Sequence, residues 1–448
     1  MPNTPNLYDV AIVGAGPAGS TAALKLGESG LRVLLLEKAN AFPREKPCGG
    51  GITARALTRL PHLRGILDTI SVNTLSKMYL ESPDGTGMEY TDPTGDPILY
   101  LVRRIQFDAA LFAHASAAAD IALGATVTAM VTVGKPVHEL NPGGAIHNSS
   151  TVRSGIDESN TRPGDPSQVV QLSTADGRTF HARMVIGADS ANSVIARLSG
   201  LRTGEVHGQY AVDMMEETPY TQLDTRYKDR VTLLLTLDSS YGYGYIFPKE
   251  THINLGFGSG PDYFVQHVRG RAREHHLAFV EQMKARGFAA GESRPENYRA
   301  FPIPISGPMG TTYTDRVLLA GDAAGMVNAF SAEGIYFAMV SGDLAADAAI
   351  LALRRNRFDA RQLSSYQDAW EREIGPELRH SVQIQRRLFT QPGRVDSLMR
   401  RAQSDPELLR LLCGYAMGFA TYEQLRSHMA RVVMPQWVWG KVRSFVGG

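Results

Sequence analysis

Residues 8–20, YDVAIVGAGPAGS, begin as a short β-rich run and end in a glycine turn. The helical stretch TAALKLGESG and a second apolar run, RVLLLEK, follow; strand, turn, helix and strand within roughly 30 residues predict a βαβ unit. Gly14, Gly16 and Gly19 allow backbone N–H groups at a helix N-terminus to approach a pyrophosphate closely. Glu37 lies 18 residues beyond Gly19, where a carboxylate accepts hydrogen bonds from a ribose 2′-hydroxyl. The stretch predicts a site for FAD or NAD rather than NADP; a tight turn without a ligand is the alternative.

The composition is that of a globular protein large enough for two packed domains, with 448 residues, 43% hydrophobic and 20% charged. A net charge of +1 gives no field that would attract nucleic acid, so we expect no nucleic-acid partner. Two cysteines are too few for a disulfide framework or a zinc site and favour a reducing compartment. The N-terminus lacks the features of a signal peptide, and no apolar run approaches the ~20 residues that span a bilayer. We therefore expect a cytoplasmic or peripheral protein, not an integral membrane protein, and no metal site.

The rest of the chain continues in the same alternating style and then becomes helical. The pattern predicts a helix over 104–119, then strands over 127–133 and 168–173 joined by a long polar loop, and a strand–turn–helix over 184–197. It predicts a β-sheet over 209–260, followed by a strand, a loop and a long helix over 316–353. The remaining residues are predicted to be helices broken at Pro376, Pro392 and Pro406.

Asp322, in RVLLAGDAAG, favours FAD among the dinucleotides. An Asp between an apolar strand and a helix can bond the ribityl hydroxyls of a flavin. The helix N-terminus near Gly334 and Ile335 would then stabilise the negative charge at the N1/O2 edge of the reduced ring. A simple helix cap is the alternative reading of Asp322.

Together these motifs resemble the large FAD-dependent family that includes p-hydroxybenzoate hydroxylase, the flavin halogenases and the geranylgeranyl reductases. The resemblance covers roughly residues 8–350 and rests on GAGPAGS, RIQFD, GADSANSVIAR and LLAGDAAG. It implies that Arg104 contacts the flavin nucleotide, whereas the residues alone suggest a surface ion pair at a helix N-terminus. Asp189 corresponds to the Asp of the middle motif, but Ser190 replaces the family's glycine, so Asp189 either contacts the flavin or caps a helix.

There is no second GxGxxG with its own βαβ unit, which by resemblance excludes the layout of the disulfide reductases. The electron donor is therefore NAD(P)H that binds transiently, or a separate redox partner protein such as reduced ferredoxin.

Two segments resemble the geranylgeranyl reductase branch of that family. FPREKPCGGGIT (42–53) is similar to its P-x-x-K-x-C-G-G element, and YGYGYIFPK (241–249) is similar to its Y-x-W-x-F-P element, with Tyr245 at the tryptophan position. The resemblance implies that the second segment lines the cavity over the isoalloxazine ring.

The residues of these segments suit that chemistry. Glycines 49–51 would let the backbone lie against a ring face that any Cβ would block. The aromatic residues at 241, 243, 245 and 247 alternate and share one strand face, which suits an isoprenoid chain or, alternatively, an ordinary core. Cys48 would donate a proton or shape the pocket, with a small buried hydrophobe as the alternative.

Two neighbours of Cys48 carry weaker expectations. Lys46 would pair with a phosphate or with an acid on the sheet, or else be exposed, and Thr53 would cap the following helix.

The expected site residues fall into three groups. The catalytic candidates are Cys48, Tyr243 and Tyr245. The cofactor-binding candidates are Gly14, Gly16, Ala18, Gly19, Glu37, Lys38, Cys48, Gly49, Gly50, Arg104, Val131, Asp189, Gly321, Asp322, Gly334 and Ile335. The substrate-pocket candidates are Gly51, Tyr241, Phe247 and Pro248.

The C-terminal segment from Arg379 is basic, with 11 Lys or Arg against 4 Asp or Glu. Trp437 and Trp439 lie near Lys441 and Arg443, a combination that suggests peripheral docking on an anionic membrane. A helical cap over the substrate cavity is the alternative.

We expect an α/β protein with a Rossmann-like FAD-binding domain, an inserted antiparallel β-sheet substrate domain and a C-terminal helical region. Their expected bounds are 1–70, 101–200 and 300–350 for the first, 71–100 and 201–299 for the second, and 351–448 for the third.

The resemblance implies a reductase that saturates carbon–carbon double bonds of an isoprenoid small molecule or lipid by hydride transfer from reduced FAD. A flavin monooxygenase of the same family is the alternative. A relative of the electron-transfer flavoprotein:quinone reductases would need a cysteine-ligated cluster, which two cysteines cannot supply. A non-catalytic prenyl carrier would have no use for the dinucleotide motifs.

Overall fold

The computed structural model describes residues 7–134, 164–165, 167–203, 210–235, 242–389 and 392–431 of the chain. Its first layer is a mainly parallel sheet built around β1 (Leu7–Val13), which pairs in parallel with β2 (Val33–Leu36) and β11 (Thr179–Gly187). The end of β1 is buried without a break, as expected of a parallel strand covered on both faces. The remaining strands of this sheet are β8 (Asp120–Ala122), β9 (Val127–Gly134), β10 (Gln168–Thr174), β19 (Tyr313–Thr314) and β20 (Val317–Leu319).

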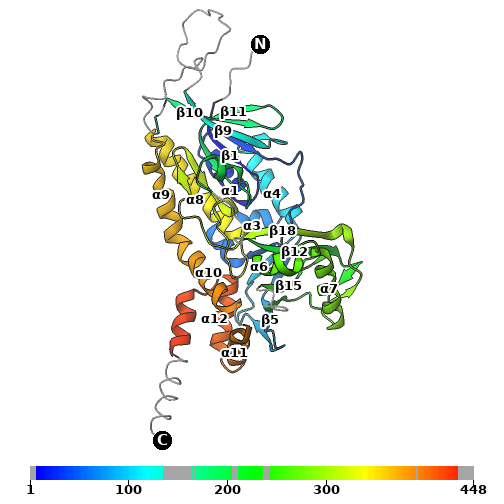
Figure 1. Ribbon diagram of the computed structural model, residues 1–448. Coiled ribbons are helices and arrows are strands. Elements are labelled where there is room, and N and C mark those ends of the chain that lie inside the picture. The colour runs from blue at the N-terminus through cyan, green and yellow to red at the C-terminus, as the bar shows by residue number, and fades with distance from the viewer. Residues whose placement is uncertain are drawn as a thin grey trace, which may run out of the picture.

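Helix α1 (Pro17–Glu28) lies between α4 (Arg104–Ser116) and α8 (Ile335–Arg355) and covers the sheet (Figure 1). The approach of α8 is close because Gly342 has no side chain; a Cβ there would lie 2.2 Å from the carbonyl oxygen of Ala18. Among the described residues, α8 is the one helix long and apolar enough to cross a membrane, but 78% of that segment is buried inside the protein.

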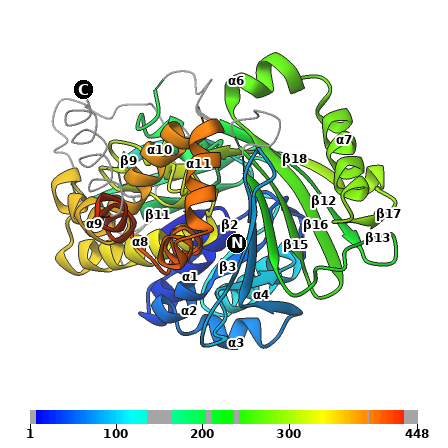
Figure 2. The ribbon, with the colours of Figure 1, turned by 90° about the horizontal axis from the view of Figure 1, so that it is seen from below.

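The second layer is a seven-stranded sheet in the order β18-β12-β16-β15-β14-β5-β6. Its strands are β5 (Lys77–Glu81), β6 (Gly87–Thr91), β12 (Tyr210–Pro219), β14 (Val231–Leu235), β15 (Tyr243–Pro248), β16 (His252–Ser259) and β18 (Tyr298–Pro304). Every neighbouring pair is antiparallel except β14 and β5, which join the two sequence segments of this layer in parallel. Figure 2 shows α7 (Ala272–Ala285) on the side of this sheet that faces away from α1.

The remaining elements that precede the C-terminal helices are short. They are β3 (Gly51–Thr53), β4 (Val72–Leu75), β7 (Leu99–Val102), α2 (Ala54–Arg59), α3 (Leu63–Leu67), α5 (Val194–Leu198), α6 (Pro261–Tyr263), η4 (Phe264–Val268), η5 (Pro295–Asn297), η6 (Gly321–Ala324), β13 (Leu223–Asp224) and β17 (Ala290–Gly291). Strands β3, β7 and β4 form a small sheet of their own.

The C-terminal region is helical, as predicted; its first helix packs against the first layer and its last two against the second sheet. It contains α9 (Ala360–Glu373), α10 (Gly375–Phe389), α11 (Pro392–Ala402) and α12 (Pro406–Met417). The prolines predicted as breaks stand in the first turns of α10, α11 and α12, where the missing N–H costs no helical hydrogen bond. Leu408 and Met399 of these helices share a core with Met78 and Tyr90 of β5 and β6.

The predicted α/β fold with its second sheet and helical C-terminus is confirmed. The predicted pairing of the strands at 127–133 and 168–173 is also found, between β9 and β10, while most of the loop predicted between them lies outside the described residues. The basic tryptophan segment around Trp437 and Trp439 also lies outside the described residues. The domain boundaries stay predictions; β18 runs across the one placed at 299/300.

Candidate functional site

A cavity of about 630 Å³ lies between the two sheets and reaches the C-terminal helices. Its lining changes from polar at the turn after β1 to aromatic and aliphatic at the second sheet, with the loop 46–51 between them. Most of the residues predicted for the site line this one cavity.

The turn after β1 has the geometry predicted for an anion-binding loop. Gly14 has φ +104°, and a Cβ there would lie 2.3 Å from the carbonyl oxygen of Ala188, so a side chain is excluded. Gly16 is the N-cap of α1 and lines the cavity with Ala18. Gly19 does not line the cavity; a Cβ there would lie 1.8 Å from the carbonyl oxygen of Gly14, so Gly19 seats the helix on the turn.

Glu37 stands at the end of β2 and lines the cavity, as does Lys38. The Glu37 carboxylate accepts hydrogen bonds from the backbone N–H groups of Ala15 and Ala39, both at 3.0 Å. These two bonds orient the carboxylate at the rim of the glycine turn. The Glu37 residue is 5% exposed.

Arg104 is buried rather than part of a surface ion pair. Its guanidinium donates two hydrogen bonds to the Asp108 carboxylate, at 2.7 and 2.9 Å, and the residue is 6% exposed. Burial opposes the charge of Arg104, but Asp108 and then Cys48 raise the pKa of the guanidinium overall. Arg104 therefore presents a permanent positive charge to the cavity beside the Cys48 thiol.

Asp322 lies on η6, directly after β20, and its side chain faces the cavity near the start of α8. Gly334, not Asp322, is the N-cap of α8, and the Asp322 carboxylate oxygen lies 3.5 Å from the position of a Gly334 Cβ. Gly321, at φ +62°, and Ile335 also line this region.

Asp189 caps helix α5, one of the two roles expected for it, and also lines the cavity. Its carboxylate accepts hydrogen bonds from the Val194 and Ile195 N–H groups at the start of α5, at 2.6 and 3.1 Å, and from the Ser193 hydroxyl.

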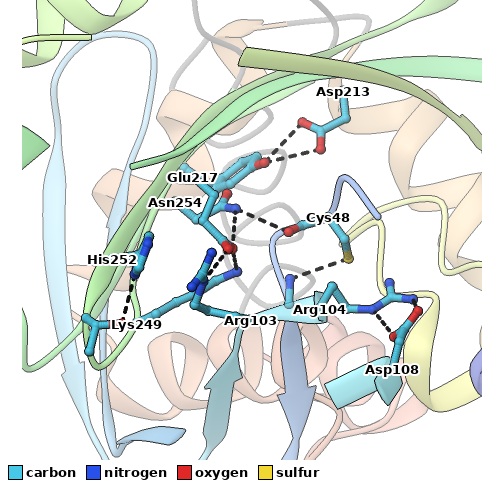
Figure 3. A network of polar contacts seen from close by, with 12 residues as sticks. Cys48, Arg103, Arg104, Asp108, Asp213, Glu217, Lys249, His252 and Asn254 are labelled. Atoms are coloured by element: carbon cyan, nitrogen blue, oxygen red, sulfur yellow. Dashed lines mark hydrogen bonds and ion pairs between the residues drawn. The ribbon is translucent and has the colours of Figure 1, made fainter. Parts of the chain in front are cut away.

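The loop at 46–51 is tied to the second sheet at Cys48 (Figure 3), and the Val102 N–H of β7 donates to its Gly50 carbonyl. The Asn254 amide donates to the Cys48 carbonyl at 3.2 Å, and the Gly50 N–H donates to the Cys48 sulfur at 3.4 Å. The Phe247 ring leaves no room for a side chain at Gly49, since a Cβ there would lie 2.7 Å from that ring. Gly51 lines the cavity beside Cys48, whose side chain is partly exposed.

One expectation for this loop is wrong, that Thr53 caps the following helix with its side chain, and the pairing of Lys46 with a phosphate stays a prediction. The Lys46 ammonium lies 2.9 Å from the ring centroid of Phe301 on β18 rather than on an acid of the sheet, and burial lowers the pKa of Lys46 to about 8. Thr53 does not cap α2 with its side chain; its hydroxyl donates to Glu333 at 2.5 Å because β3 carries it toward the start of α8.

The aromatic strand β15 divides its side chains between two faces, as predicted. Tyr243, Tyr245 and Phe247 line the cavity, while Pro248 does not, because it belongs to the opposite face of the strand. The Tyr243 hydroxyl donates to the carbonyl of Ser331 at 2.6 Å. Tyr241 lies outside the described residues.

Val131 does not belong to the site. It is 50% exposed on β9 and does not line the cavity. The residues from this part of the chain that do line it are Ala125, Thr126 and Val127, at and just before the beginning of β9, so the expected position is displaced along the chain.

Sequence reasoning missed a buried charge cluster behind the cysteine loop (Figure 3). Arg103 and Lys249 both bond the Glu217 carboxylate, the former at 2.7 Å. Burial raises the pKa of Glu217, but Lys249 and Arg103 lower it overall; burial lowers the pKa of Lys249. A lysine directly after the Phe-Pro pair of β15 was the available signal.

It also missed Asp213, an acid in the apolar strand run YAVDMM. Asp213 lines the cavity and is 6% exposed, and its carboxylate accepts a hydrogen bond from the Tyr245 hydroxyl at 3.2 Å. Burial raises the pKa of Asp213 to about 7, although the Tyr245 hydroxyl acts against it.

The polar end of the cavity fits a dinucleotide. The Arg44 Nε and Ser190 Oγ atoms are buried on its lining, and neither has a hydrogen-bond partner among the described residues. A pyrophosphate requires hydrogen-bond donors and positive charge, which the glycine turn at the helix N-terminus and the two arginines supply. A ribose requires an acceptor, which the oriented carboxylate supplies. Arg44 is a further residue that the sequence reading missed.

Comparisons with known proteins identify the family and the fold. Residues 7–369 match the family model described as FAD binding domain. Digeranylgeranylglycerophospholipid reductase 2 of Methanopyrus kandleri is 28% identical over 418 residues, covering 91% of this chain and 93% of the relative. Chloroplastic geranylgeranyl diphosphate reductase of Arabidopsis thaliana is 29% identical over 378 residues, covering 83% and 72%. The crystal structure of a geranylgeranyl bacteriochlorophyll reductase-like protein from Thermoplasma acidophilum superposes with a TM-score of 0.72, at 20% identity, covering 95% of this chain and 96% of that one.

Proposed function

This chain belongs to the FAD binding domain family, and from that premise we propose that it saturates carbon–carbon double bonds of an isoprenoid by hydride transfer from reduced FAD. An FAD-dependent oxidoreductase is the class that the sequence predicted; the substrate and the reaction are our proposal. The names of the relatives support an isoprenoid diphosphate or a prenylated glycerophospholipid as the substrate.

The observation that carries the proposal is the continuity of the cavity. It runs from the glycine turn past Cys48 to a wall of apolar side chains, so a nucleotide at one end and a water-poor chain site at the other share one space. The apolar wall consists of Leu99, Leu233, Tyr243, Phe247, Ile303, Phe330 and Met417.

When bound, FAD would supply the two-electron chemistry. We assign the pyrophosphate to the turn of Gly14 and Gly16, the adenosine ribose to Glu37, and the ribityl chain to Asp322. The N-terminus of α8 at Gly334 would face the electron-rich edge of the ring, where its dipole is favourable.

The protein's own residues would then hold and shield the substrate. Tyr243 and Phe247 exclude water from the chain site, and the Cys48 thiol shapes the pocket or donates a proton there. Arg104 keeps a fixed positive charge beside the thiol.

The test is an anaerobic single turnover with chemically reduced protein and a panel of prenyl substrates, including geranylgeranyl diphosphate and a digeranylgeranyl glycerophospholipid. We expect reoxidation of the flavin and a product that gains two hydrogens per reduced bond by mass spectrometry. Failure with every prenyl substrate, together with oxygen incorporation into a product in air, would instead identify a monooxygenase. Parallel assays with NADH, NADPH and reduced ferredoxin would identify the electron donor.

A further inference from the structure

A buried carboxyl group faces the cavity without a cation beside it. Asp213 lies on β12 with its side chain on the cavity face, and both of its oxygens lie 3.2 Å from the Tyr245 hydroxyl. Among the described residues no Lys, Arg or His forms an ion pair with Asp213. A buried carboxyl group with one hydroxyl partner and no cation favours its neutral, protonated form.

Two glycines of β16 create this arrangement. In the sheet β16 lies between β15 and β12, and Tyr245 is paired with Gly256. A Cβ on Gly256 would lie 2.8 Å from the Tyr245 hydroxyl oxygen, so this glycine lets the phenol cross the strand and reach Asp213. Gly258 is paired with Asp213, and a Cβ there would meet nothing within 4 Å. The carboxyl group therefore opens onto empty space in the cavity.

Burial, and not a neighbouring charge, favours the protonated form of Asp213. Tyr243 and Tyr245 of β15 face it across the sheet, and Tyr298 of β18 lies close enough that Asp213 contributes to its raised pKa. Phe301, the β18 residue paired with Asp213, has the Lys46 ammonium on its ring, and among the described residues no ion pair joins Lys46 to Asp213. Burial, acting against the Tyr245 hydrogen bond, raises the pKa of Asp213 to about 7.

We propose that Asp213 is the internal proton donor for saturation of the double bond, and that Tyr245 positions its carboxyl group toward the substrate. This inference rests on the proposed function. Saturation breaks the π bond and adds a hydride to one carbon, supplied by the dihydroflavin that the proposed function names, and a proton to the other. The O–H bond of Asp213 breaks as the new C–H bond forms, and the carboxylate left behind takes a proton from water.

The first test measures the proton directly on the oxidised, flavin-loaded protein. Infrared difference spectroscopy across a pH titration should show a protonated carboxyl band that is lost with a midpoint near pH 7. The band should be missing in Asp213→Asn. It should persist in the matched control Glu216→Gln, which alters the neighbouring buried acid on the opposite face of β12, where the Ser293 hydroxyl donates to it. Tyr245→Phe should move the midpoint to higher pH, because its hydroxyl stabilises the ionised form.

The second test measures single-turnover saturation of a prenyl substrate by chemically reduced protein. We expect a loss of about 100-fold or more in Asp213→Asn, typical of a missing general acid, and a change below about twofold in Glu216→Gln. The wild-type rate should fall as pH rises through the infrared midpoint.

The two possible failures are distinguishable. Absence of turnover by the wild-type protein would overturn the proposed function. Wild-type turnover that Asp213→Asn retains, or a titration in which no band depends on Asp213, would overturn this inference.

Discussion

Replacing Gly50 with alanine should displace the loop that carries Cys48. Gly50 has φ +72°, a conformation that L side chains rarely adopt, and an added Cβ would lie 2.1 Å from the carbonyl oxygen of Val102. That atom belongs to the backbone of β7, so it cannot rotate away as a side chain could. The Gly50 carbonyl also accepts the Val102 N–H at 2.9 Å, a bond that the displacement would break.

The magnitude follows from these two contacts. A non-glycine residue in the left-handed region costs about 1–2 kcal/mol, and a lost hydrogen bond costs about 0.5–1.5 kcal/mol, so we expect a destabilisation of about 2–3 kcal/mol. Relief of the overlap requires a shift of about 1 Å, and a misplacement of that size typically lowers catalysis by about 100-fold.

The assay is urea unfolding of the variant together with a fluorescence titration of its flavin affinity. Gly51→Ala is the matched control, because Gly51 has an ordinary φ and its Cβ would approach only the tip of the Leu99 side chain, at 3.2 Å. Gly50→Ala should bind flavin at least about tenfold more weakly than Gly51→Ala, equivalent to ~1.4 kcal/mol. Equal stability and equal affinity in the two variants would refute the reasoning.

Three further changes test other parts of the site. Cys48→Ala should retain flavin affinity while altering turnover or the pattern of bonds reduced, measured by product mass spectrometry; wild-type behaviour would make the thiol a packing group. Lys249→Met should destabilise the protein by about 2–3 kcal/mol in urea unfolding, below the ~3–5 kcal/mol of a fully broken buried pair because Arg103 still bonds Glu217; a loss below about 1 kcal/mol would contradict it. Burial lowers the pKa of His276 to about 4, so the unfolded state binds the proton first as pH falls. Wild-type stability should therefore drop by about 3 kcal/mol relative to His276→Gln between pH ~6.5 and ~4, and a constant difference would contradict the assignment.

The local parts of the site were readable from the chain itself. A strand, a glycine turn and a helix follow one another within a short segment, so Gly14, Gly16 and Glu37 could be placed at one edge of a sheet before any tertiary contact was known. The alternation along β15 likewise predicted that Tyr243, Tyr245 and Phe247 share a face, because strand side chains alternate with a period of two.

Other predictions failed or remained open where a distant partner decides the role of a residue. Thr53 stands at the N-terminus of a helix, as a cap would, but its hydroxyl donates instead to Glu333, which is 280 residues away in the chain. Lys46 was expected to pair with a phosphate or with an acid of the sheet, or else to be exposed; its ammonium lies on the ring of Phe301, and the phosphate pairing stays a prediction. The three consecutive glycines were expected to lie against a flavin ring. At two of them the protein itself also leaves no room for a side chain, since a Cβ on Gly49 would overlap the ring of Phe247 and a Cβ on Gly50 the carbonyl oxygen of Val102.

By itself the sequence determined the βαβ unit and the face of the aromatic strand, since each depends on residues close together in the chain, and it determined the class of cofactor from two such local motifs, the glycine turn and the segment of Asp322. Only the tertiary structure decided which charges meet at the site. Asp213 and Tyr245 are 32 residues apart and touch because β16 lies between their strands with a glycine at the crossing point. Lys249, directly after β15, and Glu217 of β12 likewise meet across β16, where Asn254 is the residue paired with Glu217. Strand order and register are set by the burial of the whole sheet, and no local pattern encodes them.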